Sequence, residues 1–290
     1  MIIAIVGPTG VGKTALSIAL AKYYKAEIIN FDAMQVYEKM DIGTAKVTKI
    51  EMDGVKHHLL SYVDIDTNYS VYDYQKEARS LIDKLLKEKK NIIMVGGTGL
   101  YLKATLYDYR FNKEEKTTNY DDLSIEELLN RISKYNYIPK DSNNKRRLIR
   151  ELVKLENNEE IDNNGDKLLY NAKIIGLTTD RETLYDRINK RVDIMIEEGL
   201  VEEVSSLKDK FTTSKALKTA IGYKEFIPYF NSECSLEEVI QKIKQNSRHY
   251  AKRQYTFFNH QLPVTWYQSN FTDFSKTVNI VIDDIDRDDR

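Results

Sequence analysis

The chain has 290 residues, of which 41% are hydrophobic and 31% are charged, so it can bury a substantial core in one large or two modest domains. Its single cysteine, Cys234, excludes a disulfide framework and a cysteine-rich metal site, and a reducing cytoplasm fits this composition. No apolar run approaches the length that spans a bilayer, so we expect no membrane segment. The net charge of -1 argues against a nucleic-acid partner, but the charges are unevenly distributed along the chain.

The first hundred residues alternate between strands and helices. Continuous apolar runs predict strands at Ile2–Val6, Glu27–Phe31 and Asn91–Val95, and helical spacing predicts helices at Thr14–Tyr24 and Ser70–Lys89. Short apolar strands separated by helices are typical of a parallel sheet that is covered on both faces. The fold class is therefore predicted to be α/β with a mainly parallel sheet.

The middle of the chain is dense in Asn, Lys, Asp and Glu, and it predicts only two helices, at Ile125–Ser133 and Lys145–Leu155. We interpret residues 111–171 as a small helical insertion domain. The core domain is then formed by residues 1–110 and 172–290.

The last third returns to regular elements. In order, it predicts a strand at Ala172–Leu177, a helix opened by the capping-box pair Thr179 and Glu182, a helix from Ser235 to about Phe258, and a strand at Val264–Tyr267. The acidic tail from Asp283 to Asp289 follows, and we expect it to be frayed and solvated.

The segment GPTGVGKT follows a strand, opens a helix and satisfies the phosphate-loop (P-loop) pattern at every fixed position. Its glycines let the backbone wrap an anion, Lys13 supplies a positive charge, and the Thr14 hydroxyl is a candidate Mg²⁺ ligand. A turn that merely joins strand to helix would not need both side chains. Alone, the motif is typical of proteins that bind ATP or GTP. The predicted binding residues are Gly7, Pro8, Thr9, Gly10, Val11, Gly12, Lys13 and Thr14.

The carboxylate nearest to this loop comes from an unusual place. Hydrolysing P-loop proteins hold Mg²⁺ partly through an aspartate after a second core strand, but here Val95 is followed by Gly96 and Gly97. Asp32 instead follows the strand at Glu27–Phe31, and it should face the loop because strand carboxyl ends carry the ligand in such sheets. Capping of a turn is the alternative role for Asp32. The combination favours a small phosphorylated donor and an acceptor positioned by Asp32.

Two basic clusters suggest contact with RNA. No acidic residue occurs between Lys244 and His260, where Lys244, Arg248 and Lys252 are spaced as one helical stripe. The interleaved aromatic residues Tyr250, Tyr255, Phe257 and Phe258 suit stacking on unpaired bases. A solvated face with the aromatic rings in the core is the alternative. The segment from Lys145 to Lys154 is a second cluster, for which a solvated helix is an equal alternative.

A family resemblance joins these features. The segments GPTGVGKT, FDAMQVY, DIGTAK, HHLL, VGGTGLYLKA, RVDIMIEEGLVEEV, AIGYKE and YAKRQYTFF occur in the same order in tRNA dimethylallyltransferases, also called tRNA isopentenyltransferases. The chain resembles this family over residues 1–107 and about 172–260. The resemblance implies a P-loop NTPase-like core. It also implies transfer of a dimethylallyl group from dimethylallyl pyrophosphate to N6 of the adenosine 3′ of the anticodon (position 37). The implied tRNAs read codons that start with U, and diphosphate is released.

The resemblance also implies roles for individual residues. Asp32 is the implied general base, Thr98 lies beside the target nucleotide, and Arg191 grips the pyrophosphate, with Mg²⁺ as the cofactor. The implied tRNA contacts are Asp32, Ala33, Met34, Gln35, Arg146, Arg147, Arg150, Thr219, Gly222, Tyr223, Lys224, Lys252, Arg253 and Gln254. The implied partner is the anticodon stem-loop, and we expect a monomer.

Three other functions compete with this interpretation. The P-loop alone would favour a small-molecule kinase or an ATPase. An adenylate isopentenyltransferase that acts on free nucleotide would not need the basic helix near the C-terminus. An RNA-binding module with a vestigial P-loop is disfavoured because Lys13, Thr14 and Asp32 are all intact.

Overall fold

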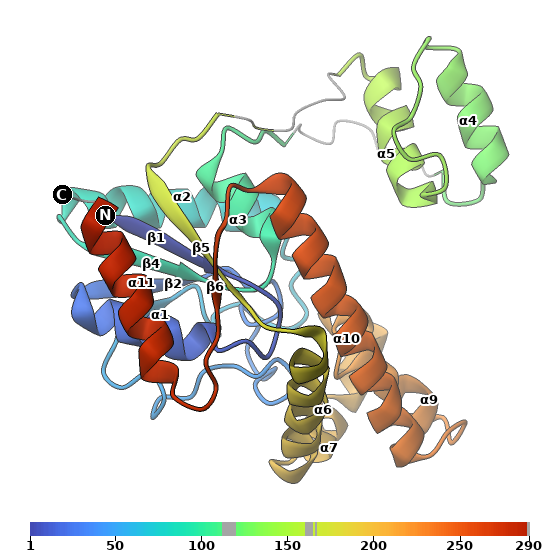
Figure 1. Ribbon diagram of the computed structural model, residues 1–290. Coiled ribbons are helices and arrows are strands. Elements are labelled where there is room, and N and C mark those ends of the chain that lie inside the picture. The colour runs from blue at the N-terminus through green and yellow to red at the C-terminus, as the bar shows by residue number, and fades with distance from the viewer. Residues whose placement is uncertain (112–119, 160–164, 166, 289–290) are drawn as a thin grey trace. The chain divides into compact units, whose positions relative to one another are not determined.

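The computed structural model describes residues 1–111, 120–159, 165 and 167–288 (Figure 1). The chain divides into two compact units, the first formed by Met1–Tyr107 with Leu168–Arg290 and the second by Asp108–Lys167. These boundaries lie a few residues before the predicted ones at 110 and 172. The first unit carries the sheet, and the second is a pair of helices.

A six-stranded sheet forms the centre of the first unit, counting the residues that the structure describes. Its strands are β1 (Ile2–Val6), β2 (Ala26–Asn30), β3 (His57–His58), β4 (Asn91–Val95), β5 (Ala172–Thr178) and β6 (Thr265–Gln268). They lie in the order β3-β2-β4-β1-β5-β6, and each pairing is parallel. The predicted α/β class with a mainly parallel sheet is therefore confirmed. Because all carboxyl ends meet at one edge, the segments that follow β1, β2 and β4 are neighbours there.

Helices cover both faces of this sheet, as the apolar strands require. The helices of the first unit are α1 (Lys13–Tyr23), α2 (Val71–Lys87), α3 (Gly99–Leu106), α6 (Arg181–Glu197), α7 (Leu200–Ser206), α8 (Lys215–Thr219), α9 (Ile227–Phe230), α10 (Leu236–Gln261) and α11 (Phe274–Asp288), with the 3₁₀ turns η1 (Lys208–Thr212) and η2 (Lys224–Phe226). One core packs α2, α3 and the end of α10 against the sheet. The other packs α1, α11 and the start of α6 against the opposite face.

A third core supports the long segment between β2 and β3. Val36, Met40 and Val63 from this segment pack with Tyr223 and Phe226, which are fully buried. Side chains from α6, α7, α8 and the first half of α10 complete the cluster. The segment after Asp32 is thereby attached to the helices at the C-terminal end of the chain.

Two details of the C-terminal third differ from the prediction. The N-cap of α6 is Asp180, whose carboxylate accepts a hydrogen bond from the Thr183 backbone N–H at 2.9 Å, so the predicted Thr179 capping box is wrong. The acidic tail is also not frayed where the structure describes it, because residues 283–288 form the last turns of α11. Asp286 accepts hydrogen bonds from the hydroxyls of Tyr23 and Tyr24 at 3.0 and 2.9 Å, which fixes α11 on α1.

The second unit contains α4 (Ile125–Ser133) and α5 (Lys145–Glu156), close to the two predicted helices. Ser124 and Glu127 form a capping box at the start of α4, and Asn144 caps α5. The apolar faces of these helices enclose a small core made of Tyr120, Leu128, Ile132, Leu148 and Leu152.

Candidate active site

The P-loop connects β1 to α1 and has the backbone shape that its glycines predict. Gly7, Gly10 and Gly12 have φ angles of 138°, 88° and 96°, a region that residues with a Cβ rarely adopt. Gly12 is the N-cap of α1, and a Cβ there would lie 2.6 Å from the ring of Phe274. The first turn of α1 therefore presents its unpaired N–H groups to any anion in the loop.

Lys13 is the first residue of α1, and its side chain contacts the loop that precedes it. Its ammonium donates to the carbonyl oxygen of Pro8 at 2.7 Å. Burial, with a smaller contribution from the charge of Arg191, lowers the pKa of Lys13 to about 7, and the negative charge of Asp32 acts in the opposite direction. An anion bound in the loop would raise the pKa of Lys13, because a nearby negative charge favours the protonated ammonium.

Two arginines from α6 reach the loop from the other side. Arg191 donates from Nη1 to Oγ1 of Thr9 at 2.8 Å, and Arg187 donates from Nε to the carbonyl oxygen of Gly10 at 2.8 Å. Burial lowers the pKa of Arg191, with a further contribution from Arg187 and an opposing one from Asp32. Arg187 also lies over the ring of Phe271, with its guanidinium carbon 3.8 Å from the ring centroid.

Asp32 occupies the first turn after β2, where hydrogen bonds hold both this residue and the peptide that follows it. Its backbone N–H donates to Oδ1 of Asn30 at 3.2 Å, and its own Oδ1 accepts from the N–H of Met34 at 3.0 Å. The next peptide is fixed by Thr98, whose Oγ1 accepts from the N–H of Ala33 at 3.0 Å. The negative charge of Asp32 acts on the pKa of both Lys13 and Arg191. The structure therefore brings the predicted base, Thr98 and the predicted anion grip into one site.

The loop that follows Asp32 is anchored by a carboxylate of α7. Glu203 accepts hydrogen bonds from the backbone N–H groups of Asp41, Ile42 and Gly43 at 3.0, 2.8 and 3.0 Å. It also accepts one from the hydroxyl of Tyr223 at 2.6 Å. Four donors converge on one side chain, so Glu203 holds the segment of residues 41–43 against the buried Tyr223.

Replacement of Glu203 by glutamine is expected to loosen this anchor. Glutamine has one acceptor oxygen, and its NH₂ group would face N–H donors. We expect the free energy of unfolding of the first unit to fall by about 2 kcal/mol, the cost of losing charge-assisted hydrogen bonds. Faster amide exchange at residues 41–43 should accompany this loss. The matched control is Glu202→Gln, the adjacent exposed carboxylate. Equal stability of both variants would contradict the anchoring role.

The predicted tRNA contacts from the end of α8 to the start of η2 differ in how far they are exposed to solvent. Thr219 is exposed and Lys224 is half-buried, whereas Gly222 and Tyr223 are buried. Gly222 has a φ angle of 93°, and its N–H donates to Glu225 at 2.9 Å. The side chain of Tyr223 thus supports the loop from inside.

The three cations of the basic stripe predicted along α10 have different surroundings, because two of them contact α6. Lys244 forms an ion pair with Asp193 at 2.5 Å, and Arg248 donates to Oδ1 of Asn189 at 2.6 Å, so both cations bind α6. Lys252 and Arg253 remain exposed. Two of the three predicted cations are therefore engaged by α6, a helix distant in the sequence, and the role of the stripe in binding RNA stays a prediction.

Most aromatic rings near this stripe face the protein. Phe258 is fully buried, Tyr255 shares a 2.7 Å hydrogen bond with the Thr178 hydroxyl, and Tyr250 donates to the carbonyl oxygen of Gly97 at 3.4 Å. Phe257 is half-buried and packs against Gly99, where a Cβ would lie 2.2 Å from its ring. The alternative of core aromatic residues thus applies to these rings, and Phe257, which also packs against the core, lines a surface hollow as well.

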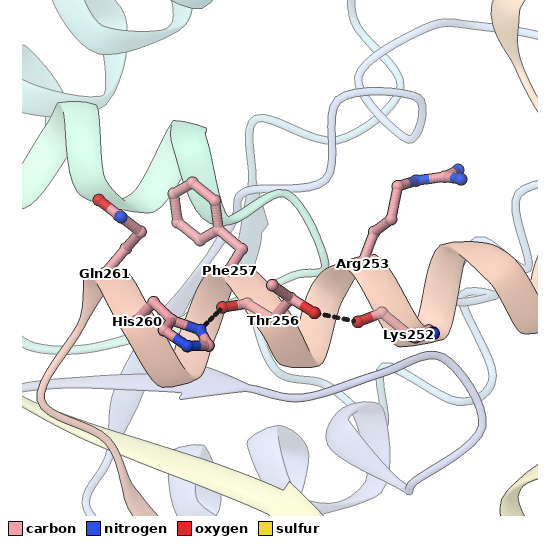
Figure 2. A pocket seen from close by; sticks show the side chains of 6 residues that line it. All are labelled: Lys252, Arg253, Thr256, Phe257, His260 and Gln261. Atoms are coloured by element: carbon pink, nitrogen blue, oxygen red, sulfur yellow. Dashed lines mark hydrogen bonds between the residues drawn. The ribbon is translucent and has the colours of Figure 1, made fainter. Parts of the chain in front are cut away.

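Figure 2 shows a surface hollow on the outer side of α10. Phe257 points toward α3, and the His260 ring is bonded to the carbonyl oxygen of Thr256 at 2.7 Å. The hollow is lined by Lys252, Arg253, Thr256, Phe257, His260 and Gln261. It combines cations with one accessible ring, the combination that single-stranded RNA favours.

The predicted contacts Arg146, Arg147 and Arg150 lie on α5 in the second unit, which is described by itself. All three are exposed. Arg147 donates from Nε to Glu151 at 3.0 Å, whereas the other two extend from the surface of the helix. These residues stay a prediction.

The comparisons with known proteins bear on the family. The sequence model described as "IPP transferase" matches residues 35–261. The chain belongs to this family. The tRNA dimethylallyltransferase of Bacillus pumilus is 43% identical over 282 residues, which are 92% of this chain and 89% of the relative. That of Latilactobacillus sakei is 45% identical over 284 residues, which are 92% of this chain and 91% of the relative.

Solved structures agree with this membership of the IPP transferase family. The tRNA isopentenylpyrophosphate transferase of Bacillus halodurans has a TM-score of 0.78 at 40% identity, covering 98% of this chain and 95% of that one. The Staphylococcus epidermidis transferase has a TM-score of 0.76 at 36% identity, covering 99% and 98%. The resemblance to the family and the P-loop core are thereby confirmed. Among the helices that the structure describes, none has the length and apolarity to cross a membrane.

Sequence reasoning missed several groups in this IPP transferase site. Arg187 precedes Arg191 by one helical turn, a spacing that would have indicated two cations on one face. Asn30, which holds Asp32, carries no signal, because an asparagine at a strand end has many possible roles. Gln254 was predicted as an RNA contact, but it is buried and only 5% exposed.

Proposed function

We propose that this chain transfers the dimethylallyl group of dimethylallyl pyrophosphate to N6 of adenosine 37 of tRNA, in tRNAs that read codons starting with U. The observation that carries the proposal is the placement of Asp32. Its carboxylate lies at the sheet edge where β1 supplies a P-loop, and its charge acts directly on Lys13 and Arg191. A base beside an anion cradle is the arrangement that transfer from a pyrophosphate to an amine requires.

The chemistry explains why both parts are needed. The exocyclic N6 is a weak nucleophile because its lone pair is delocalised into the adenine ring. In the proposed reaction, N6 forms a bond to C1 of the allylic donor while the bond from C1 to the pyrophosphate oxygen breaks. The proton of N6 passes to the carboxylate of Asp32, and the electron pair leaves with diphosphate. Lys13, Arg191 and the loop N–H groups stabilise the charge that gathers on the leaving group.

A divalent cation fits this site as a partner of the donor. Mg²⁺ prefers oxygen ligands and retains several waters, so it is commonly held by one or two protein groups together with substrate phosphates. The Thr14 hydroxyl at the start of α1 offers one such oxygen. No cluster of three His, Cys, Asp or Glu side chains suited to a metal occurs in the described parts of the chain. Thr14 and the phosphate oxygens of the donor would together hold Mg²⁺, which would neutralise charge on the diphosphate.

The proposed acceptor surface is the exposed side of α10 and the loop after Asp32. Lys252, Arg253 and Phe257 line one hollow and offer charge and a ring to the anticodon stem-loop. Residues 32–35 would contact the target nucleotide. Adenosine 37 must leave its stack to reach Asp32, as in other enzymes that act on a base. We propose that the chain acts as a monomer in the cytoplasm, with Arg146 and Arg150 as further contacts.

The direct test is incubation of the protein with unmodified tRNA, dimethylallyl pyrophosphate and Mg²⁺, followed by mass analysis of the nucleosides. Prenylated adenosine at position 37 is expected, with equimolar release of diphosphate. Phosphate release from ATP without prenyl transfer would instead identify a kinase or an ATPase.

Charge reversal on α10 should weaken binding of the tRNA acceptor without affecting binding of the donor. In the double variant Lys252→Glu with Arg253→Glu, we expect the KM for tRNA to rise by roughly tenfold or more, because two phosphate contacts become repulsive. The affinity for dimethylallyl pyrophosphate should remain unchanged. Steady-state kinetics at two salt concentrations measures both, and the tRNA effect should shrink at high salt. An adenylate transferase would give a different result. The wild type would show little activity on tRNA, and the variant would still prenylate free AMP.

A further inference from the structure

Gln254 joins two parts of the site that no other contact described above connects. It follows the exposed Lys252 and Arg253 on α10, but its own side chain is buried. Its Oε1 accepts from the backbone N–H of Thr9 at 3.1 Å. Its Nε2 donates to the carbonyl oxygen of Gly97 at 2.9 Å. One neutral amide thus satisfies a donor of the P-loop and an acceptor at the end of β4.

The two hydrogen-bond partners of Gln254 belong to different parts of the proposed site, the diphosphate grip and the general base. Thr9 holds Arg191 through its hydroxyl, so this end belongs to the diphosphate grip. Gly97 precedes Thr98, which fixes the peptide after Asp32, so the other end belongs to the general base. A Cβ at Gly97 would lie 2.4 Å from Nε2 of Gln254 and 3.3 Å from Oδ2 of Asp32. The amide therefore packs beside the base as well as bonding to the loop.

We propose that Gln254 is a positioning residue that sets the distance between the diphosphate cradle and the general base. This inference rests on the proposed function. Its physical basis is that the hydrogen bond to the Gly97 carbonyl is buried and the one from the Thr9 N–H is partly buried, so loss of the amide would leave both groups poorly solvated and without this partner. Tyr250 reaches the same carbonyl at 3.4 Å, so α10 holds this point with two donors one turn apart. Gln254 acts on the geometry of transfer, whereas its neighbours Lys252 and Arg253 face the RNA.

The test compares Gln254→Met with the wild type. Methionine has a similar length and fills the same space, but it makes neither hydrogen bond. Because the reacting atoms must be held to within about an ångström, we expect kcat to fall by roughly a hundredfold. The KM for tRNA should stay within about twofold, because the RNA-facing side chains remain. The fraction of intact sites is counted by titration with inorganic diphosphate and Mg²⁺, and kcat is expressed per intact site.

Two further variants make the test specific. Gln245→Met alters an exposed glutamine of the same helix, and it should leave kcat and both KM values unchanged. Gly97→Ala inserts a methyl group where the Gln254 amide lies, and it should reproduce the loss of kcat with the glutamine intact. Thermal unfolding of each variant shows that the protein is folded at the assay temperature.

The possible outcomes distinguish the inference from the proposed function. A loss of kcat at constant tRNA KM in both Gln254→Met and Gly97→Ala supports the positioning role. A raised tRNA KM with unchanged kcat in Gln254→Met would overturn it and assign Gln254 to RNA contact. Unchanged kinetics in an active background would also overturn it. A wild-type protein that transfers no prenyl group would refute the proposed function and the inference with it.

Discussion

Replacement of Asp32 by asparagine is expected to lower kcat for prenyl transfer by roughly a thousandfold, the scale of a lost general base. The substitution keeps Oδ1, which accepts from the N–H of Met34, so the turn after β2 should hold its shape. The amide cannot accept the proton of N6. Affinity for inorganic diphosphate should be unchanged or slightly higher, because a negative charge near Lys13 and Arg191 is removed.

The measurement is single-turnover transfer to tRNA, together with calorimetric titration of diphosphate in Mg²⁺. Glu38→Gln serves as the control, since Glu38 is an exposed carboxylate in the same segment. Unchanged turnover in Asp32→Asn would refute the assignment of Asp32 as the base. A loss of diphosphate affinity together with turnover would instead indicate that Asp32 acts through the metal-bound donor.

Replacement of Arg191 by alanine is expected to raise the KM for dimethylallyl pyrophosphate by roughly 10- to 100-fold, the range for losing a charge-assisted hydrogen bond. The guanidinium is held in place by Thr9 at 2.8 Å, so its charge is fixed next to the loop before the donor arrives. The KM for tRNA should change by no more than about threefold. The kcat should also fall, because the same charge stabilises the leaving diphosphate.

Donor and acceptor titrations of the same variant separate these effects. Lys190→Ala is the matched control, because this lysine lies one position earlier on α6, points to solvent and pairs only with the exposed Asp186 among the contacts described. A variant of Arg191 that impairs tRNA more than donor would contradict the assignment. A similar but smaller effect of Arg187→Ala would show that both arginines hold the loop.

The parts of the fold that sequence predicts well are those with local signals. The continuous apolar runs of β1, β2 and β4 indicated a buried parallel sheet, and its carboxyl edge placed Asp32 next to the P-loop. The helix α3 was missed because its segment is buried nearly all round, from Tyr101 to Leu106, so it has no amphipathic pattern. The glycines that precede it are typical of a loop.

The parts that sequence does not predict depend on partners far along the chain. The sequence places Lys244 and Arg248 in a cationic stripe, but it does not show that they contact Asp193 and Asn189 of α6. The acidic tail is part of a helix because Val281 and Ile285 pack into the core beside α1, and the tyrosines of α1 bond Asp286. Gln254 likewise turns inward because Thr9 and Gly97 lie beside it, and neither is near it in sequence.

The chain leaves the first unit after Tyr107 and returns to it at Leu168, where these two residues form an antiparallel bridge. The backbone N–H of Leu169 donates to the carbonyl oxygen of Leu106 at 2.7 Å, which closes the junction. Because Tyr107 and Leu168 are adjacent, the length of the segment from Asp108 to Lys167 does not affect the distance between the strands of the sheet. This segment can therefore differ in length or internal structure without moving the strands that carry the P-loop and Asp32.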